Sequence, residues 1–157
     1  MQKIVTFLWF DTEAEAAARF YVSLFEDAKL GDIARYGDAG PGPRGQAMIV
    51  SFELSGVAYT ALNGGPHYQL TEAFSLQVHC ADQAEIDDLW GKLSADGGEP
   101  GQCGWLKDRF GLSWQIVPAR MGELIGGDDP AKAGRAVQAM LQMKKLDIAA
   151  LKTAHAG

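Results

Sequence analysis

Polar residues alternate with apolar ones along residues 74–80, and three of them are the first candidates for chemistry in this chain. Ser75, Gln77 and His79 fall on one face of the strand that this segment predicts, because successive side chains of a strand point to opposite faces. An imidazole can act as a general base on a bound molecule. The simpler interpretation is that His79 makes one hydrogen bond at the rim of a cavity, and both interpretations stay open.

Further candidates lie on three other expected strands. Tyr59 and Asn63 flank Ala61 at alternate positions, and a small residue between two polar ones leaves room for a ligand. Gln115 lies in the last strand, whereas the pattern does not fix the facing of Trp105, which could line the cavity. We therefore predict a ligand-binding site composed of Tyr59, Asn63, Ser75, Gln77, His79, Trp105 and Gln115.

The elements that position these residues repeat once along the chain. A β-branched and aromatic run at 4–10 predicts a strand, and a helix with Thr12 and Glu15 at capping-box spacing follows it. The same order returns about 70 positions later, where Asp82 caps the second helix. The strand candidates are 4–10, 29–36, 46–54, 57–63, 74–80, 112–117 and, as one or two short strands, 102–107. Each half therefore has the order β-α-β-β-β.

This repetition predicts an α+β fold. Two βαβββ modules, at about 1–66 and 70–120, form a cupped mixed sheet and together make one domain, residues 1–120. Neither module can bury its sheet face alone, and pairing them would cover one common cavity.

Residues 121–157 differ in character and predict a C-terminal helical extension. Asp129 followed by Pro130 is a helix start, and a second short helix is expected around Ile148 and Leu151. Helices this short are marginal without packing. They need an apolar surface, either on their own domain or on a dimer partner, and both remain open.

At this point the chain resembles the PhnB-like, or 3-demethylubiquinone-9 3-methyltransferase, branch of the vicinal oxygen chelate superfamily, which includes glyoxalases, bleomycin-resistance proteins and dioxygenases. Two βαβββ modules are the architecture of that superfamily. The resemblance is carried by Leu8 to Asp11 and on through Ala16, Phe20, Tyr21, Leu24, Phe25, the run Ala61 to Pro66 and the run Gly104 to Gln115. It implies a cavity that holds a small molecule, but members differ widely in activity.

The same resemblance locates the positions where a metal would be bound. Members with metal chemistry place His and Glu ligands on the inner faces of four strands, and the corresponding positions here are Ile4, Tyr59, Ser75 and Gln115. Neutral hydroxyl and amide oxygens suit neither Zn²⁺ nor Fe²⁺. Shifting each position by one residue still finds no His or Glu. We therefore expect no metal and no other cofactor.

Two functional classes follow from these observations. The first is a small-molecule-binding protein without a catalytic metal. The alternative is an isomerase, lyase or transferase acting on a small oxygenated or aromatic substrate through His79, Tyr59 or Gln115. Methyl transfer is the activity that the branch's label implies. Common S-adenosylmethionine enzymes need a glycine-rich turn after the first strand of a doubly wound sheet, and Thr12 marks a turn without glycine here.

Composition limits the partners. The 157 residues carry a net charge of −6 without a Lys/Arg cluster, which argues against nucleic acid, and no run reaches the roughly 18 apolar residues of a membrane span. Two cysteines, Cys80 and Cys103, are too few for a disulfide scaffold, and no basic leader opens the chain. We expect a cytoplasmic protein, a homodimer that binds a small-molecule ligand.

Two remaining signals receive simple interpretations. Residues 37–45 contain four glycines, but they lack the Gly-Lys-Ser/Thr of a phosphate-binding loop and predict a mobile hairpin loop. His67 falls in the segment between the modules, at the surface or as a gate, and His155 lies in a solvated tail.

Overall fold

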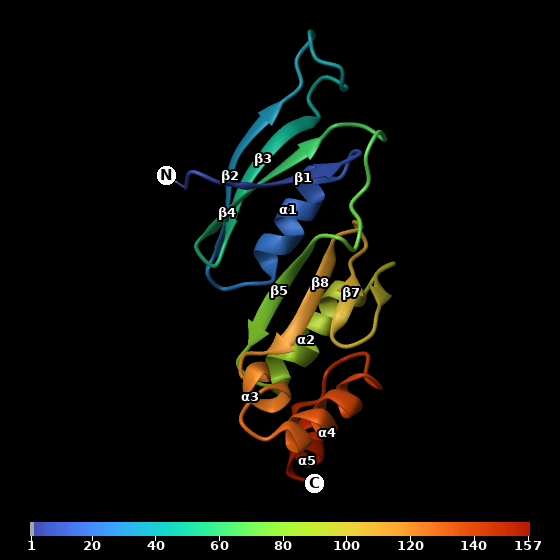
Figure 1. Cartoon of the computed structure of the whole chain (residues 1–157). Coiled ribbons are helices and arrows are strands. Elements are labelled where there is room, and N and C mark those ends of the chain that lie inside the picture. The colour runs from blue at the N-terminus through green and yellow to red at the C-terminus, as the bar shows by residue number, and fades with distance from the viewer. Residues whose placement is uncertain (1) are drawn as a thin grey trace. The chain divides into compact units, whose positions relative to one another are not determined.

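The protein is described by a computed structural model that covers residues 2–157 and divides into two compact units (Figure 1). The first unit ends at Leu70, and the second runs from Thr71 to Gly157. Each unit contains one four-stranded mixed sheet with elements in the order β-α-β-β-β. The predicted α+β fold, with a repeated module and C-terminal helices, is confirmed.

The first unit is built from β1 (Thr6–Phe10), α1 (Ala14–Ser23), β2 (Ala28–Arg35), β3 (Ala47–Leu54) and β4 (Val57–Asn63). Its strand order is β1-β4-β3-β2, with β1 parallel to β4 and the other neighbours antiparallel. Helix α1 covers one sheet face, where Leu8, Val50 and Ala61 are buried. On the same face, the ring of Phe52 lies 6.2 Å from that of Tyr21 in α1.

The second unit repeats this plan with β5 (Ser75–Cys80), α2 (Gln83–Ser94), β6 (Glu99–Pro100), β7 (Trp105–Lys107) and β8 (Ser113–Pro118). The strand order is β5-β8-β7-β6, and β5 runs parallel to β8. Alternate residues of β8, Trp114 and Ile116, are buried, and so are Ile86 and Leu89 of α2. On the opposite, polar side of this sheet lie Ser75, Gln77 and His79 of β5.

The two repeated helices begin in different ways. Asp82 accepts a hydrogen bond from the Glu85 amide at 2.9 Å, as predicted for α2. Thr12 does not cap α1: that helix starts at Ala14 after Glu13, which makes no side-chain cap. The Ala14 amide donates instead to Asn63 Oδ1 at 2.8 Å.

The extension forms α3 (Met121–Ile125), α4 (Pro130–Met140) and α5 (Ile148–Ala156), and α4 begins at the predicted cap, Asp129. Leu146 and Leu151 are buried against Val117, so the extension packs on its own chain. Between α4 and α5, the carbonyls of Met143 and Lys144 accept hydrogen bonds of 2.8 Å from the amides of residues 103 and 104.

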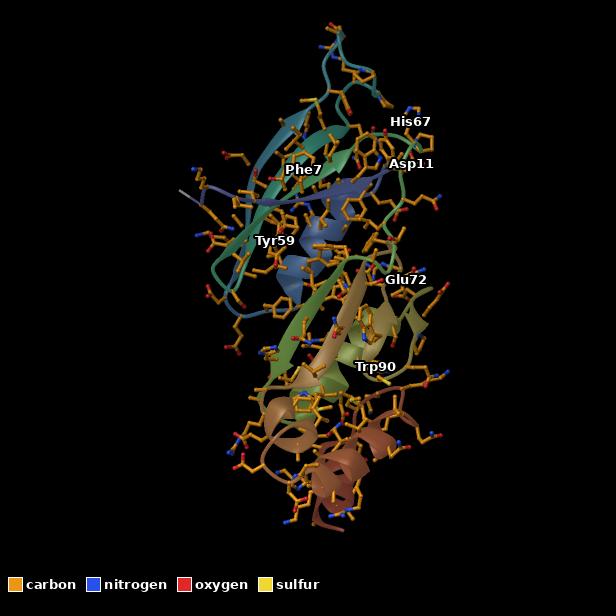
Figure 2. All side chains as sticks on the ribbon, in the orientation of Figure 1. Phe7, Asp11, Tyr59, His67, Glu72 and Trp90 are labelled. Carbon is orange, nitrogen blue, oxygen red and sulfur yellow. The ribbon has the colours of Figure 1, made fainter. Side chains whose placement is uncertain are left out.

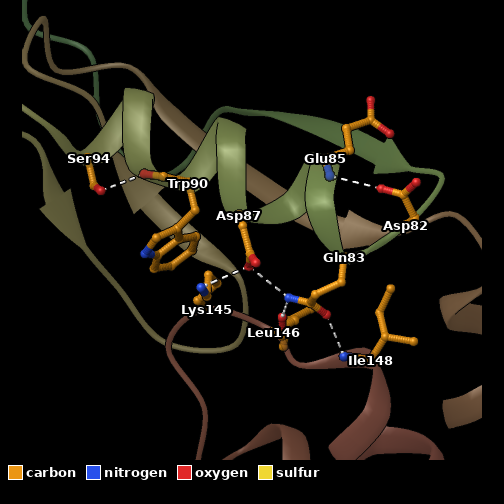
Figure 3. A network of polar contacts seen from close by, with 9 residues as sticks. All are labelled: Asp82, Gln83, Glu85, Asp87, Trp90, Ser94, Lys145, Leu146 and Ile148. Atoms are coloured by element: carbon orange, nitrogen blue, oxygen red, sulfur yellow. Dashed lines mark hydrogen bonds and ion pairs between the residues drawn. The ribbon is translucent and has the colours of Figure 1, made fainter.

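Polar side chains of α2 also hold the extension (Figure 3). Gln83 donates to the Leu146 carbonyl at 3.0 Å and accepts from the Ile148 amide at 2.8 Å. Asp87 lies 2.8 Å from the ammonium group of Lys145. Gln83 therefore satisfies one carbonyl and one amide at the entry to α5.

Among residues 2–157, none of the helices has the length and apolar character needed to cross a bilayer. Both cysteines are free; Cys80 is buried and Cys103 is half-buried.

Candidate functional site

Four of the predicted site residues form one hydrogen-bonded series on the second sheet. His79 Nε2 lies 2.8 Å from Gln77 Oε1 on β5. Gln77 Nε2 donates to Gln115 Oε1 on β8 at 3.1 Å, and Gln115 Nε2 donates back to Ser75 Oγ on β5 at 2.9 Å. We call these four residues, together with Trp105, the polar face.

The order of donors fixes the role of each group in this series. Because the Gln77 oxygen accepts, His79 must donate through Nε2–H, and a neutral ring then keeps Nδ1 as a free acceptor. At the other end, Ser75 accepts from Gln115 and keeps its hydroxyl hydrogen for a further acceptor. The polar face thus offers an acceptor at one end and a donor at the other.

Strand pairing places an aromatic ring beside this series. Trp105 on β7 is in register with Gln115, which is in register with Gln77 on β5. Gln77 and His79 are exposed, whereas Trp105 and Gln115 are half-buried. An apolar ring therefore adjoins a row of amides.

Ser113 belongs to the same side and was missed by the sequence reasoning. It is in register with Ser75, and its hydroxyl is buried without a hydrogen-bond partner within residues 2–157. Its alternation with Gln115 in the last strand was the available signal. The Ser113 hydroxyl therefore lies next to Ser75 in the sheet, but it is buried, and Ser75 is the hydroxyl that a ligand can reach.

Asn63 does not join the polar face. Its side chain is 97% buried on the α1 side of the first sheet, where Oδ1 accepts from Ala14 and Nδ2 donates to the Ala47 carbonyl at 2.9 Å. Both halves of the amide are engaged by backbone. Ala61 between Tyr59 and Asn63 is completely buried, whereas Asn63 itself lines a pocket of the first unit.

Tyr59 also lies on the α1 side. It is in register with Phe52, and the two rings stack with centroids 5.2 Å apart (Figure 2 labels Tyr59). Partial burial raises the pKa of its phenol, which stays protonated near neutral pH. Tyr59 and Asn63 belong to the first unit of the chain, whereas the polar face belongs to the second.

The four expected metal positions fall in two different units of the chain. In the first unit, Ile4 precedes β1 and is 82% exposed, and Tyr59 faces the helix side of its sheet. In the second unit, Ser75 and Gln115 hydrogen-bond to each other. Within the described residues, no group of three or more His, Cys, Asp and Glu side chains is placed to hold a metal ion.

The first unit has a pocket of its own at the ends of β1 and β4. Asp11, Tyr36 and His67 contribute to its wall, and Asp11 and His67 lie at the same end of the unit (Figure 2). The glycine-rich segment 37–45 packs over the Tyr36 ring, where a Cβ at Gly42 would overlap the ring. That ring contact gives a structural reason for the glycine.

Comparison with known proteins finds one family and several solved structures. The model of the family described as 3-demethylubiquinone-9 3-methyltransferase matches residues 2–117. None of the curated proteins compared with the chain matches it.

The solved structures resemble about three quarters of the chain. A PhnB protein from Bacillus cereus with the same methyltransferase description is 36% identical, with a TM-score of 0.69; the match covers 75% of this chain and 100% of that one. Protein PA1353 from Pseudomonas aeruginosa is 21% identical, with a TM-score of 0.62 and coverage of 75% and 98%. A glyoxalase/bleomycin resistance protein from Albidiferax ferrireducens T118 is 12% identical, with a TM-score of 0.47 and coverage of 74% and 98%.

Proposed function

The chain belongs to the 3-demethylubiquinone-9 3-methyltransferase family, a PhnB-like branch of the glyoxalase-fold superfamily, and from this premise we propose that it is a small-molecule-binding protein. Its ligand is an oxygenated or aromatic molecule that lies on the polar face. Binding requires no catalytic metal. Ser75, Gln77, His79, Gln115 and Trp105 contact the ligand.

The observation that carries this proposal is the directed series from His79 to Ser75. A series of fixed direction presents a defined acceptor at one end and a defined donor at the other. Trp105 supplies apolar surface between them, and aromatic rings next to a few placed polar groups are typical of ligand sites. Hydroxyls and amides match neutral or weakly acidic oxygenated ligands.

The donor set does not fit the metal of the superfamily. Zn²⁺ and Fe²⁺ sites are built from imidazole, carboxylate and thiolate ligands. The polar face offers one imidazole, and its Nε2 already donates to Gln77. The other side chains are neutral and hydrogen-bonded to one another. The polar face is therefore not a site for Zn²⁺ or Fe²⁺.

The residues also do not fit the common S-adenosylmethionine site that the family description suggests. That site lies in a doubly wound parallel sheet after a glycine-rich turn. Here both sheets are mixed, and the turn between β1 and α1 contains Asp11, Thr12 and Glu13. The family description does not determine the reaction of this chain.

One observation favours the enzyme alternative. The free Nδ1 of a neutral His79 is an acceptor that could take a proton from a bound hydroxyl. In an enzyme, His79→Ala would abolish turnover and leave binding intact. In a binding protein, the same variant would bind more weakly and no variant would turn the ligand over.

Ligand binding is testable with catechol, phenol and 4-hydroxybenzoate as probes. Wild-type protein should gain thermal stability with probe concentration, because a ligand that binds only the native state shifts unfolding. Gln115→Ala should weaken binding by about three- to ten-fold. Gln142→Ala, at an exposed glutamine whose side chain has no hydrogen bond in the described chain, is the matched control.

Two results would contradict the proposal. The absence of a thermal shift with any probe at millimolar concentration, with or without added divalent metal, would contradict binding of an oxygenated or aromatic ligand. One equivalent of tightly held Ni, Zn, Fe or Mn, measured by elemental analysis, would contradict the proposal that the site binds its ligand without a metal. We further propose a cytoplasmic homodimer that does not bind nucleic acid; light scattering that shows a monomer at micromolar concentration would contradict the dimer.

A further inference from the structure

A second site lies in the second unit, where the extension meets the ends of the sheet. A pocket of about 200 Å³ opens there. Its apolar wall comes from the end of β5, the end of β8, α3 and α5, and consists of Cys80, Ala81, Pro118, Ala119, Leu124 and Ile148.

The wall carries no charge at neutral pH. The thiol of Cys80 is the only ionisable group among these six residues. Burial, and then the nearby carboxylates of Glu85 and Asp82, raise its pKa to about 12. The thiol is therefore protonated and behaves as a small apolar group.

Three charged side chains surround the apolar part. Arg120 is paired with Glu123, whose carboxylate lies 2.9 Å from the guanidinium. Lys152 of α5 also lines the pocket, and it has no ion pair within residues 2–157. The pocket thus combines an apolar interior with one lysine that has no ion-pair partner within residues 2–157.

The pocket depends on the extension. Leu124, Ile148 and Lys152 all lie beyond residue 117, where the family match ends. The solved relative from Bacillus cereus is covered completely while it covers 75% of this chain. The wall that supplies the positive charge is therefore built from sequence outside the family match.

We propose that this pocket binds a small carboxylate with an apolar tail, such as a short-chain fatty acid. The tail occupies the apolar interior, and the carboxylate lies beside the Lys152 ammonium. Ligand pockets for drug-sized molecules have volumes of about 300–1,000 Å³, so a pocket of this size selects a smaller ligand. The site is independent of the polar face and does not rest on the function proposed for it.

The test uses full-length protein and three six-carbon probes of different charge: hexanoate, 1-hexanol and hexylamine. Amide chemical shifts of Ala81, Ala119 and Ile148 should move on titration with hexanoate, while that of Ala61 in the first unit should stay in place. Hexanoate should bind most tightly and hexylamine most weakly. Equal affinity for all three, or the reverse order, would overturn the proposal.

Two variants test the charge of Lys152 and the open space of the pocket separately. Lys152→Gln should weaken hexanoate by about two- to five-fold, the range of one exposed ion pair, and leave hexanol unchanged. Lys144→Gln, at an exposed lysine of the extension outside the pocket, is the matched control. Ala119→Phe should fill the pocket and abolish binding of hexanoate and hexanol.

The two sites are distinguishable with one further variant. Gln115→Ala should leave the hexanoate titration unchanged, because Gln115 is not part of the pocket. Unchanged hexanoate affinity in Lys152→Gln, or unchanged pocket shifts in Ala119→Phe, would overturn the assignment even if the polar face binds its own ligand.

Discussion

The carboxylate of Asp87 on α2 lies 2.8 Å from the ammonium group of Lys145, at the point where the chain enters the last helix. The same carboxylate accepts a hydrogen bond of 3.0 Å from Gln83 (Figure 3). The hydrogen bond from Lys145, and then that from Gln83, lowers the pKa of Asp87. The attachment of the extension is therefore linked to pH.

Asp87→Asn should make the free energy of unfolding less dependent on pH in the acidic range. A carboxyl whose pKa is lowered by folding stabilises the native state above its ordinary pKa of 3.8. This stabilisation is lost as the pH falls through the lower folded-state value. Urea midpoints should therefore differ between wild type and variant at pH 7, and the difference should shrink below pH 3.8.

Asp88, the next carboxylate on α2, is the control for Asp87, and hydrogen exchange is the measurement. Asp88 pairs with Lys92 at 2.9 Å within α2 and does not reach the extension. Asp88→Asn should leave hydrogen exchange of the Leu146 and Ile148 amides as in wild type. An equal increase of exchange in both variants would contradict a specific role of Asp87.

Gln83→Ala should loosen the start of α5. The substitution leaves the Leu146 carbonyl and the Ile148 amide without their partner, which costs about 1–3 kcal/mol. Hydrogen exchange at Ile148 should rise, and the free energy of unfolding of the second unit should fall. Gln142→Ala should change neither quantity. Wild-type hydrogen exchange of the Ile148 amide in Gln83→Ala would contradict the role of Gln83 at the start of α5.

Asn63→Ala should destabilise the first unit by about 2–5 kcal/mol, because two buried backbone groups lose their partners. Asn63→Asp should cost at least as much at neutral pH, since one carboxylate oxygen can accept from the Ala14 amide but the other is buried against the Ala47 carbonyl oxygen and repelled by it. Chemical denaturation measures both values. Wild-type stability in Asn63→Ala would contradict the structural role of this amide.

The direction of the polar series predicts the tautomer of His79. Neutral His79 should carry its proton on Nε2, because the Gln77 oxygen accepts from that atom. Nitrogen-15 spectra at pH 9 report the tautomer directly. Gln77→Leu should raise the fraction of the Nδ1–H tautomer, whereas an Nδ1–H tautomer in wild type would show that the Gln77 amide is reversed.

Local patterns predicted the repeated module and most of the polar face. The alternation at 75–80 put Ser75, Gln77 and His79 on one side, and the parallel pairing of β5 with β8 brings Gln115 among them. Both are consequences of strand geometry. The prediction of Asp82 as a helix cap was equally local, since donor and acceptor are three residues apart.

Long-range contacts explain what the sequence reasoning missed. Alternation on β4 grouped Tyr59, Ala61 and Asn63 correctly, but it could not tell which side α1 covers. Ala61 is completely buried on the side of the sheet that α1 covers. Thr12 lost its expected role because Asn63, distant in sequence, binds the first helical amide.

The amides of Cys103 and Gly104 donate to the carbonyls of Met143 and Lys144. A chain that ended before these carbonyls would leave two adjacent amides of the turn before β7 without their partners, which costs free energy. The C-terminal residues therefore complete the hydrogen bonding of the turn that leads into β7, and truncated chains should unfold at a lower urea concentration than the full chain.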